Sequence, residues 1–176
     1  MKRICLGTAG LLITLSLTGT AAAQAGQLPP YKSWAGWREG SSATMKTESL
    51  AEGAKQIITT TVTLKKVSSE AVVLDVAMTI EVAGQKFEQP AMPIEVRADT
   101  AESSPDEKAK ITRGRETLTV NGKKFDCEWT QIAIPDGNMK KTWICKDVPG
   151  GVVKETWKSD GSNTLSQLLD FKGQKK

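Results

Sequence analysis

The alternation of side chains between Val72 and Val82 (VVLDVAMTIEV) constrains the fold more than any other feature of the chain. An apolar residue occupies every second position of this stretch. Successive side chains of a strand point to opposite faces, so this period of two predicts a strand with one buried face. Residues Gln56–Lys66 (QIITTTVTLKK) are rich in β-branched side chains, which also favour a strand. Amphipathic helical stretches are scarce, and the sequence therefore indicates a mostly β fold.

Turn residues separate the predicted strands. Gly84-Gln85 (AGQK) fits a two-residue type II′ turn that leads into a further strand, Lys86–Arg97. Pro90 and Pro93 cannot donate a backbone hydrogen bond, so they place this strand at a sheet edge or interrupt it.

The second half of the chain repeats this pattern. Asn121-Gly122 is a strong type I′ hairpin signal between Glu116–Val120 and Lys123–Trp129. We expect further strands around Lys140–Lys146 and Val152–Lys158.

The turns that flank these last two strands have their own signals. Val148–Gly151 (VPGG) suits a type II turn between them, and Asp160-Gly161 marks another hairpin. Residues Thr164–Phe171 are ambiguous, because Leu165, Leu168 and Leu169 have helical spacing although the segment follows a hairpin turn.

A hairpin with a three-residue loop is predicted at residues 134–138 (IPDGN). Pro135 presets its φ angle for a turn, and Gly137 can take the left-handed position that the G1 bulge of such a hairpin requires. If Ile134 and Asn138 close the loop, the register of the two strands is fixed on either side of it.

An export signal is predicted at the amino terminus. Lys2 and Arg3 precede an apolar run that is about half the length of a membrane-spanning helix, and small residues ending at Ala23 or Ala25 offer a cleavage site. We therefore expect a cleaved signal peptide over residues 1–23 (alternatively 1–25). The remaining residues 24–176 are predicted to form a single β domain, with an exposed acidic loop at residues 98–109 (ADTAESSPDEKA).

Two cysteines remain after signal cleavage, Cys127 and Cys145. The predicted hairpin register places them opposite each other at a non-hydrogen-bonded pair, where α-carbons approach to about 4.5 Å. In an oxidising compartment such a pair most often forms a disulfide, which would stabilise the fold by roughly 3 kcal/mol. The same register places Trp129 opposite Trp143, so a one-residue slip would separate both pairs.

Net charge gives no indication of a nucleic-acid partner. The full chain carries +4 at pH 7, and its basic and acidic residues are interspersed without a basic stripe. No second apolar stretch is long enough to span a membrane as a helix. The mature chain is therefore expected in the periplasm or secreted.

No catalytic, metal or cofactor motif is recognisable in the sequence. The chain has no histidine, so neither a serine nor a cysteine nucleophile would have its usual base, and a zinc site would lack common ligands. We predict a protein without enzymatic activity and without a cofactor.

Tryptophans are the candidates for a binding surface. Trp129 and Trp143 form the predicted cross-strand pair, and Trp34 and Trp37 form a second cluster near Tyr31. Aromatic rings of this kind can line a ligand pocket, or they can fill the core at one end of a sheet. Both interpretations stay open at this stage for all four side chains.

Several short stretches resemble a group of small exported bacterial proteins of unknown function. They are WREGS (37–41), TVTLKKV (61–67), GRETL (114–118) with GKKFDC (122–127), and TW (142–143) with VPGGVVK (148–154). Such chains are similar in shape to the lipoprotein-carrier (LolA-like) superfamily of the bacterial periplasm. The resemblance implies a curved antiparallel sheet that holds an apolar ligand, and no reaction.

Taken together, these observations predict a single, strongly curved antiparallel sheet (an open half-barrel) with few helices. A closed small β-barrel is the alternative. The functional hypothesis is an exported, non-enzymatic binding protein that holds an apolar or amphiphilic, lipid-like molecule on the concave face of the sheet. The alternative function is a cell-envelope module that docks another protein through a face or an edge of the sheet.

Overall fold

Nine strands and one short helix make up the described part of the chain. The computed structural model describes residues 30–51, 54–100, 109–135 and 137–176. The predicted signal peptide, and residues 101–108 of the predicted acidic loop, lie outside the described residues. The elements are α1 (Tyr31–Ala35), β1 (Ser42–Ala51), β2 (Ala54–Val67), β3 (Ala71–Val82), β4 (Gln85–Arg97), β5 (Lys110–Val120), β6 (Lys123–Ala133), β7 (Met139–Ile144), β8 (Val152–Ser159) and β9 (Ser162–Lys172).

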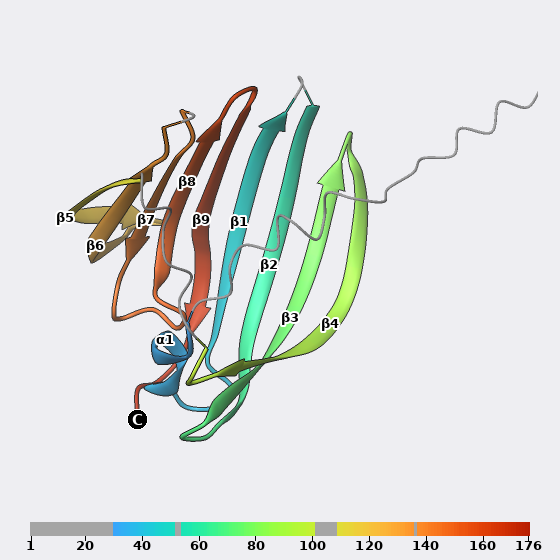
Figure 1. Ribbon diagram of the computed structural model, residues 1–176. Helices are drawn as coiled ribbons and strands as arrows, with labels where there is room; N and C mark the ends of the chain where they lie inside the picture. The colour runs from blue at the N-terminus through green and yellow to red at the C-terminus, as the bar shows by residue number, and fades with distance from the viewer. Residues whose placement is uncertain (1–29, 52–53, 101–108, 136) are drawn as a thin grey trace, which may run out of the picture.

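The described strands form one antiparallel sheet in the order β4-β3-β2-β1-β9-β8-β7-β6-β5. Two meanders are therefore joined side by side, β1–β4 and β5–β9, and the seam between them is the pairing of β1 with β9 (Figure 1). At this seam Thr44 pairs with Asp170 and Met45 with Leu168, so Leu169 is an extra residue in a β-bulge.

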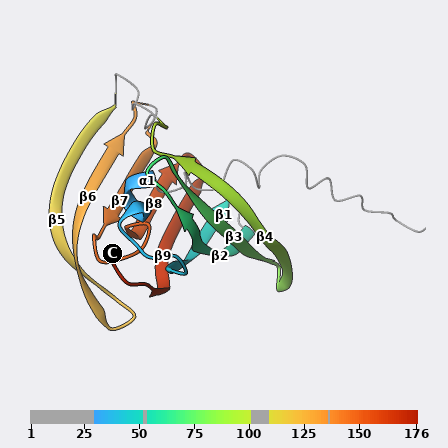
Figure 2. The same cartoon turned by 90° about the horizontal axis from the view of Figure 1, so that it is seen from below.

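The sheet is strongly curved and does not close. Viewed from below, its two ends, β5 and β4, lie on opposite sides of the molecule, and α1 lies between them (Figure 2). The predicted open half-barrel with few helices is confirmed, and the closed-barrel alternative is wrong because β4 and β5 do not pair.

The alternating stretch of β3 forms part of the core, as its period predicts. Val72 and Leu74 are fully buried, and Leu74 pairs with Leu64 of β2, which is equally buried. Trp34 of α1 belongs to the same cluster. Burying each large apolar side chain of this kind stabilises the fold by roughly 1.5–3 kcal/mol.

Helix α1 is anchored across the lower end of the sheet by hydrogen bonds at two places. The Tyr31 hydroxyl donates to the Ser68 carbonyl in the β2–β3 turn at 2.6 Å. On the other side, the Gly150 N–H donates to the Ser33 carbonyl at 3.2 Å, which ties α1 to the β7–β8 loop. The helix and the segment after it therefore fill the inside of the curve at this end.

Strand β4 is an edge strand, as its prolines predict. In its pairing with β3, Val76 lies opposite Met92 but Met78 lies opposite Gln89. Pro90 and its neighbour Ala91 therefore form a bulge, and a proline is tolerated there because no ladder hydrogen bond is lost.

The hairpins of the second half have the predicted registers. Val120 pairs with Lys123 around Asn121-Gly122, and both turn residues have positive φ, as a type I′ turn requires. The segment that was ambiguous between helix and strand, residues 164–171, is part of strand β9.

The turn between β3 and β4 differs from the prediction. Val82 pairs with Gln85, so the two turn residues are Ala83 and Gly84, not Gly84 and Gln85. Their φ angles are 51° and 78°, which makes this a turn of type I′. The predicted type II′ turn at Gly84-Gln85 is therefore wrong by one residue, and Ala83 takes a left-handed conformation that alanine rarely adopts.

Replacement of Ala83 by asparagine should therefore stabilise the protein. A left-handed conformation costs an ordinary L-residue about 1–2 kcal/mol, and asparagine adopts it more readily. We expect the free energy of unfolding of Ala83→Asn to rise by about 0.5–1 kcal/mol in urea titrations. Ala91→Asn, in the neighbouring strand, is the control; a wild-type midpoint for Ala83→Asn would contradict the turn assignment.

Candidate functional site

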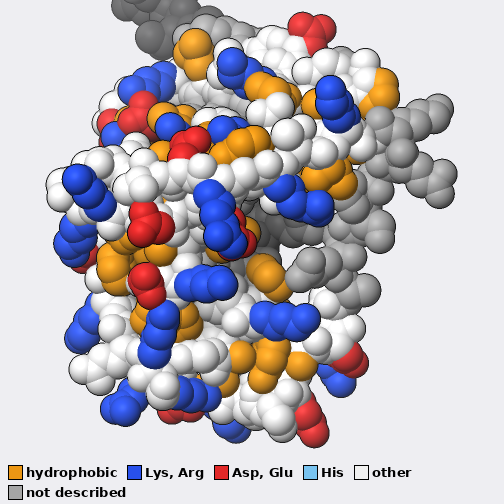
Figure 3. Space-filling model, turned by 90° about the vertical axis from the view of Figure 1, so that its left-hand side faces the viewer, with side chains coloured by type: hydrophobic (Ala, Val, Ile, Leu, Met, Phe, Trp, Pro, Cys, Tyr) orange, Lys and Arg blue, Asp and Glu red, His pale blue; other side chains and the backbone are white. Residues whose placement is uncertain are grey.

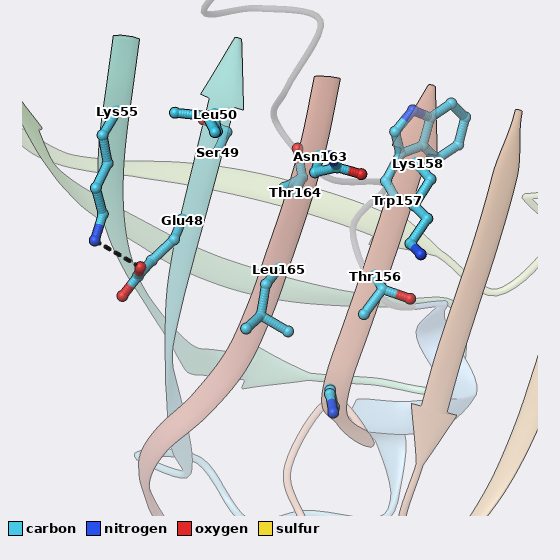
Figure 4. A pocket seen from close by; sticks show the side chains of 11 residues that line it. Glu48, Ser49, Leu50, Lys55, Thr156, Trp157, Lys158, Asn163, Thr164 and Leu165 are labelled. Atoms are coloured by element: carbon cyan, nitrogen blue, oxygen red, sulfur yellow. Dashed lines mark ion pairs between the residues drawn. The ribbon is translucent and has the colours of Figure 1, made fainter. Parts of the chain in front are cut away.

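A cavity of about 640 Å³ lies at the upper end of the sheet, between the β1–β2 and β8–β9 hairpins (Figure 4). The side chains or backbone of eleven residues line it: Glu48, Ser49, Leu50, Lys55, Lys154, Thr156, Trp157, Lys158, Asn163, Thr164 and Leu165.

Register explains why these residues meet on one face. The two-residue turn at Asp160-Gly161 pairs Thr156 with Leu165, and β1 pairs Glu48 with the same Leu165. Directly opposed residues share a face of the sheet. Figure 4 shows Leu165 between Glu48 and Thr156, with all three projecting from neighbouring strands.

The cavity lies on the reverse side of the sheet from the core under α1. In β1, Ala43 points into the core, where it pairs with the buried Val62. Glu48 is separated from Ala43 by an odd number of positions along the strand, so it points to the opposite face. The ligand was predicted on the concave face. Inside the curve at the lower end, however, that space is occupied by the side chains around α1.

The floor of the cavity has exposed apolar side chains. Leu50 and Leu165, which share the face of Glu48, are 51% and 38% exposed. Apolar groups of this size are normally buried, so a cluster around a hollow marks a surface that can bind an apolar partner.

One carboxylate in the cavity is already neutralised. Glu48 binds Lys46 at 2.6 Å and Lys55 at 2.9 Å. The hydrogen bond from Lys46, followed by that from Lys55, lowers the pKa of Glu48 to about 2. The Glu48 carboxylate therefore stays charged at any physiological pH and is committed to these two lysines.

Two other lysines of the cavity make no ion pair with a carboxylate of the described residues, Lys154 and Lys158. They lie four positions apart on the same face of β8, and Thr156 lies between them. The Lys154 ammonium is 5.1 Å from the ring centre of Trp143, within reach of a cation–π interaction.

The predicted indole pair, Trp129 and Trp143, flanks the cavity without lining it. The two residues pair across β6 and β7 as predicted, and Trp143 pairs on its other side with Lys154. Lys141 lies 4.2 Å and 4.4 Å from the two ring centres. The indole N–H of Trp143 donates to Glu116 at 2.7 Å, which holds the buried ring in place.

Trp34 and Trp37 are buried, with only 1% and 6% of their surface exposed, and they lie at the opposite end of the sheet from the cavity. Gly173 lies close to the Trp37 ring, because a Cβ atom at this glycine would be 2.9 Å from it. A ligand-lining role for any of the four tryptophans stays a prediction, whereas the packing of Trp34 and Trp37 in the core is observed.

Gly114 is required by the position of Trp129. The two residues pair across β5 and β6, and a Cβ atom at Gly114 would lie 2.5 Å from the indole ring. We expect Gly114→Ala to destabilise the protein by about 1–3 kcal/mol, because the ring must move. Gly36→Ala is the matched control, since a Cβ there meets nothing within 4 Å. Equal denaturation midpoints for the two variants would show that the ring has room to move.

Cys127 and Cys145 are both buried and are free thiols in this structure, so the predicted disulfide is not observed. The register that led to it is observed, because Glu128 pairs with Ile144 and the next position along places the two cysteines opposite each other. The bond itself remains a prediction.

Burial, followed by the proximity of Cys145 and Glu116, raises the pKa of the Cys127 thiol to about 11. The folded state thus favours the protonated thiol. In the reduced protein this contribution to stability is present below pH 9 and is lost as the pH rises toward 11.

We expect the disulfide to form in exported protein. Oxidation of the reduced, folded protein at neutral pH should be slow, because the thiolate is the reactive species and the Cys127 thiol is protonated at that pH. Peptide mapping of exported material should find Cys127 linked to Cys145. In the reduced protein, alkylation should be slow up to about pH 10 and become fast on unfolding. Two free thiols in exported protein would contradict the disulfide.

A second hollow of about 560 Å³ lies at β5, β6 and the end of β7. Arg115 binds Glu128 at 2.9 Å and the Thr117 hydroxyl donates to Asp126 at 2.7 Å. Glu116 and Asp147 bind two lysines outside the lining, Lys141 and Lys175. Four carboxylates line this hollow against one arginine and one lysine, so it attracts an anion less than the first cavity does.

Sequence reasoning missed the lining residues of the main cavity. The hairpin signal at Asp160-Gly161 already fixes the pairing that brings Lys154, Lys158 and Leu165 to one face. The wall of the cavity formed by β8 and β9 could therefore have been predicted. The other half, Glu48 and Lys55, depends on the pairing of β1 with β9, for which no local signal exists.

No family model and no curated protein matches this chain. Among solved structures, an exported protein with a YmcC-like fold from Bacteroides fragilis covers 77% of this chain and 96% of its own, with 12% identity and a TM-score of 0.44. A LolA superfamily protein from Nitrosomonas europaea covers 78% and 87%, with 8% identity and a TM-score of 0.26. A domain of an outer membrane lipoprotein-sorting protein from Vibrio parahaemolyticus covers 76% and 85%, with 12% identity and a TM-score of 0.25.

Likeness at these identities and TM-scores assigns neither a ligand nor an activity to this chain. Among the described residues, no helix has the length and apolar character needed to cross a membrane. The same residues contain no cluster of three or more cysteine or acidic side chains placed to hold a metal ion.

Proposed function

We propose that this protein is an exported, non-enzymatic binding protein that holds an amphiphilic, lipid-like molecule in the cavity between the β1–β2 and β8–β9 hairpins. The observation that carries the proposal is the combination of exposed apolar side chains and lysines around one hollow. Its volume of about 640 Å³ falls within the range of small-molecule sites, about 300–1,000 Å³.

The physical reason is the cost of exposing apolar surface to water. Leu50 and Leu165 come from strands that are neighbours in the sheet, so a hydrocarbon chain laid between the hairpins would cover both. Each square ångström of apolar surface removed from water contributes about 25 cal/mol. A polar end could remain in solvent at the rim, which favours an amphiphile over a purely apolar molecule.

Export follows from the predicted signal peptide, residues 1–23, and not from the fold. We propose the periplasm or the external medium as the site of function. In either compartment a lipid has very low free solubility, so a protein with an open apolar cavity has a physical role there.

The proposal is tested by a matched pair of leucine variants on β9. Leu165 lines the cavity, whereas Leu169 is similarly exposed, 40% against 38%, but lies in the bulge outside it. We expect Leu165→Gln to weaken the binding of a fluorescent fatty-acid probe about fivefold or more, and Leu169→Gln to leave it unchanged. Native mass spectrometry of protein from its own host should show a bound amphiphile.

Equal effects of the two leucine variants, or no binding of any apolar probe, would contradict the proposal. Circular dichroism of both variants confirms that each is folded, so that a loss of binding reports on the cavity alone.

The open edge of β5 favours the second candidate function, docking of an envelope protein. β5 is the end strand of the sheet, contains no proline, and has Lys110, Arg113 and Arg115 exposed. Figure 3 shows this side of the molecule, where basic side chains outnumber acidic ones between hydrophobic patches. An unpaired strand edge can accept a strand from a partner. A dimer or complex with an empty cavity in the same native spectra would favour this function over ligand binding.

A further inference from the structure

We infer that the molecule held in the main cavity is a single-chain amphiphile with an anionic headgroup, bound by Lys154 and Lys158. This inference rests on the proposed function and names the chemical class of its ligand.

The charge around the cavity is unbalanced. Of the charged side chains that line it, three are lysines and one is a carboxylate. The carboxylate, Glu48, is shared between Lys55 and Lys46, at 2.9 Å and 2.6 Å. An incoming anion therefore meets no free negative charge among the described lining residues.

Lys154 and Lys158 contrast with three lysines that lie outside the cavity. Lys65 binds Asp75 at 3.4 Å, Lys140 binds Glu155 at 3.1 Å and Lys175 binds Asp147 at 2.7 Å. Neither Lys154 nor Lys158 forms an ion pair within the described part of the chain, and both line the cavity. Each of these lysines can therefore bind an anionic group at the wall of the cavity.

The position of Leu165 fits a chain attached to that anion. Leu165 pairs with Thr156, which is midway between Lys154 and Lys158 along β8, and the two lysines are about 13 Å apart along the strand. An anionic group at either lysine thus has the apolar side chain of Leu165 within reach on the next strand. Figure 4 shows Leu165 and Thr156 on this adjoining surface, with Lys158 near the upper rim.

A substitution of Glu48 provides a control in which the affinity for an anion should change in the opposite direction. Removing its charge frees Lys46 and Lys55, which raises the positive potential of the cavity. A substitution at this carboxylate should therefore tighten the binding of an anion, while substitutions at the unpaired lysines should weaken it. General damage to the protein cannot produce both changes.

The experiment measures the binding of three probes with the same hydrocarbon chain: dodecanoate, dodecanol and dodecyltrimethylammonium, each below its aggregation limit and at low salt. We expect the secreted protein to bind dodecanoate most tightly. Lys154→Gln and Lys158→Gln should each weaken dodecanoate binding about three- to fivefold and leave dodecanol unchanged, as for exposed ion pairs. Glu48→Gln should strengthen dodecanoate binding. Lys124→Gln, an exposed lysine of β6 that lines neither cavity, should have no effect.

The outcomes separate the inference from the function on which it rests. Equal affinity for dodecanoate and dodecanol would overturn the anionic headgroup and leave the amphiphile-binding function standing. No binding of any of the three probes would overturn the proposed function itself. Lysine-dependent binding to phosphatidylglycerol vesicles without binding of dodecanoate would show a membrane surface, not a single lipid, and would also overturn the inference. Lys158 is exposed and makes no cation–π contact with a described residue, so its variant carries the test if Lys154→Gln fails to fold.

Discussion

The pairing of β1 with β9 is the interaction on which the rest of the structure depends. Each meander is held together by short hairpins, but only this seam joins the two into one sheet. Leu168 and Met45 meet across it, and the bulge at Leu169 bends the ladder at that point. Without the seam, neither the core beneath α1 nor the cavity between the hairpins would exist, because both use residues of the two halves.

The β5–β6 turn, which belongs to the edge of the sheet, also contacts β9 close to this seam. The side-chain amide of Asn121, in the β5–β6 turn, donates to the carbonyls of Leu168 and Leu169 at 3.3 Å and 2.5 Å. The ring of Phe125 meets Phe171 edge-on, with centroids 6.0 Å apart. The bulge thus leaves backbone carbonyls available to a distant turn, and the curvature of the sheet is held by polar and aromatic contacts together.

Local pairing could be predicted from the sequence, and long-range pairing could not. Hairpin registers follow from turn residues such as Asn121-Gly122 and Gly137, since each turn type allows only one pairing of its strands. Ala83 was missed because its left-handed conformation is stabilised by the pairing of β3 with β4, and its own side chain gives no signal of it. The lysine wall of the cavity was within reach of the Asp160-Gly161 signal, but its opposite wall on β1 comes from more than a hundred residues away.

The central place of β9 has a consequence for the order in which the molecule can assemble. The last strand of the chain lies in the middle of the sheet, next to the first. A polypeptide emerging amino-terminus first, from a ribosome or through a membrane pore, can make its early hairpins as it appears. The sheet cannot be completed until residues 162–172 have emerged, because β9 is the strand that joins the two meanders.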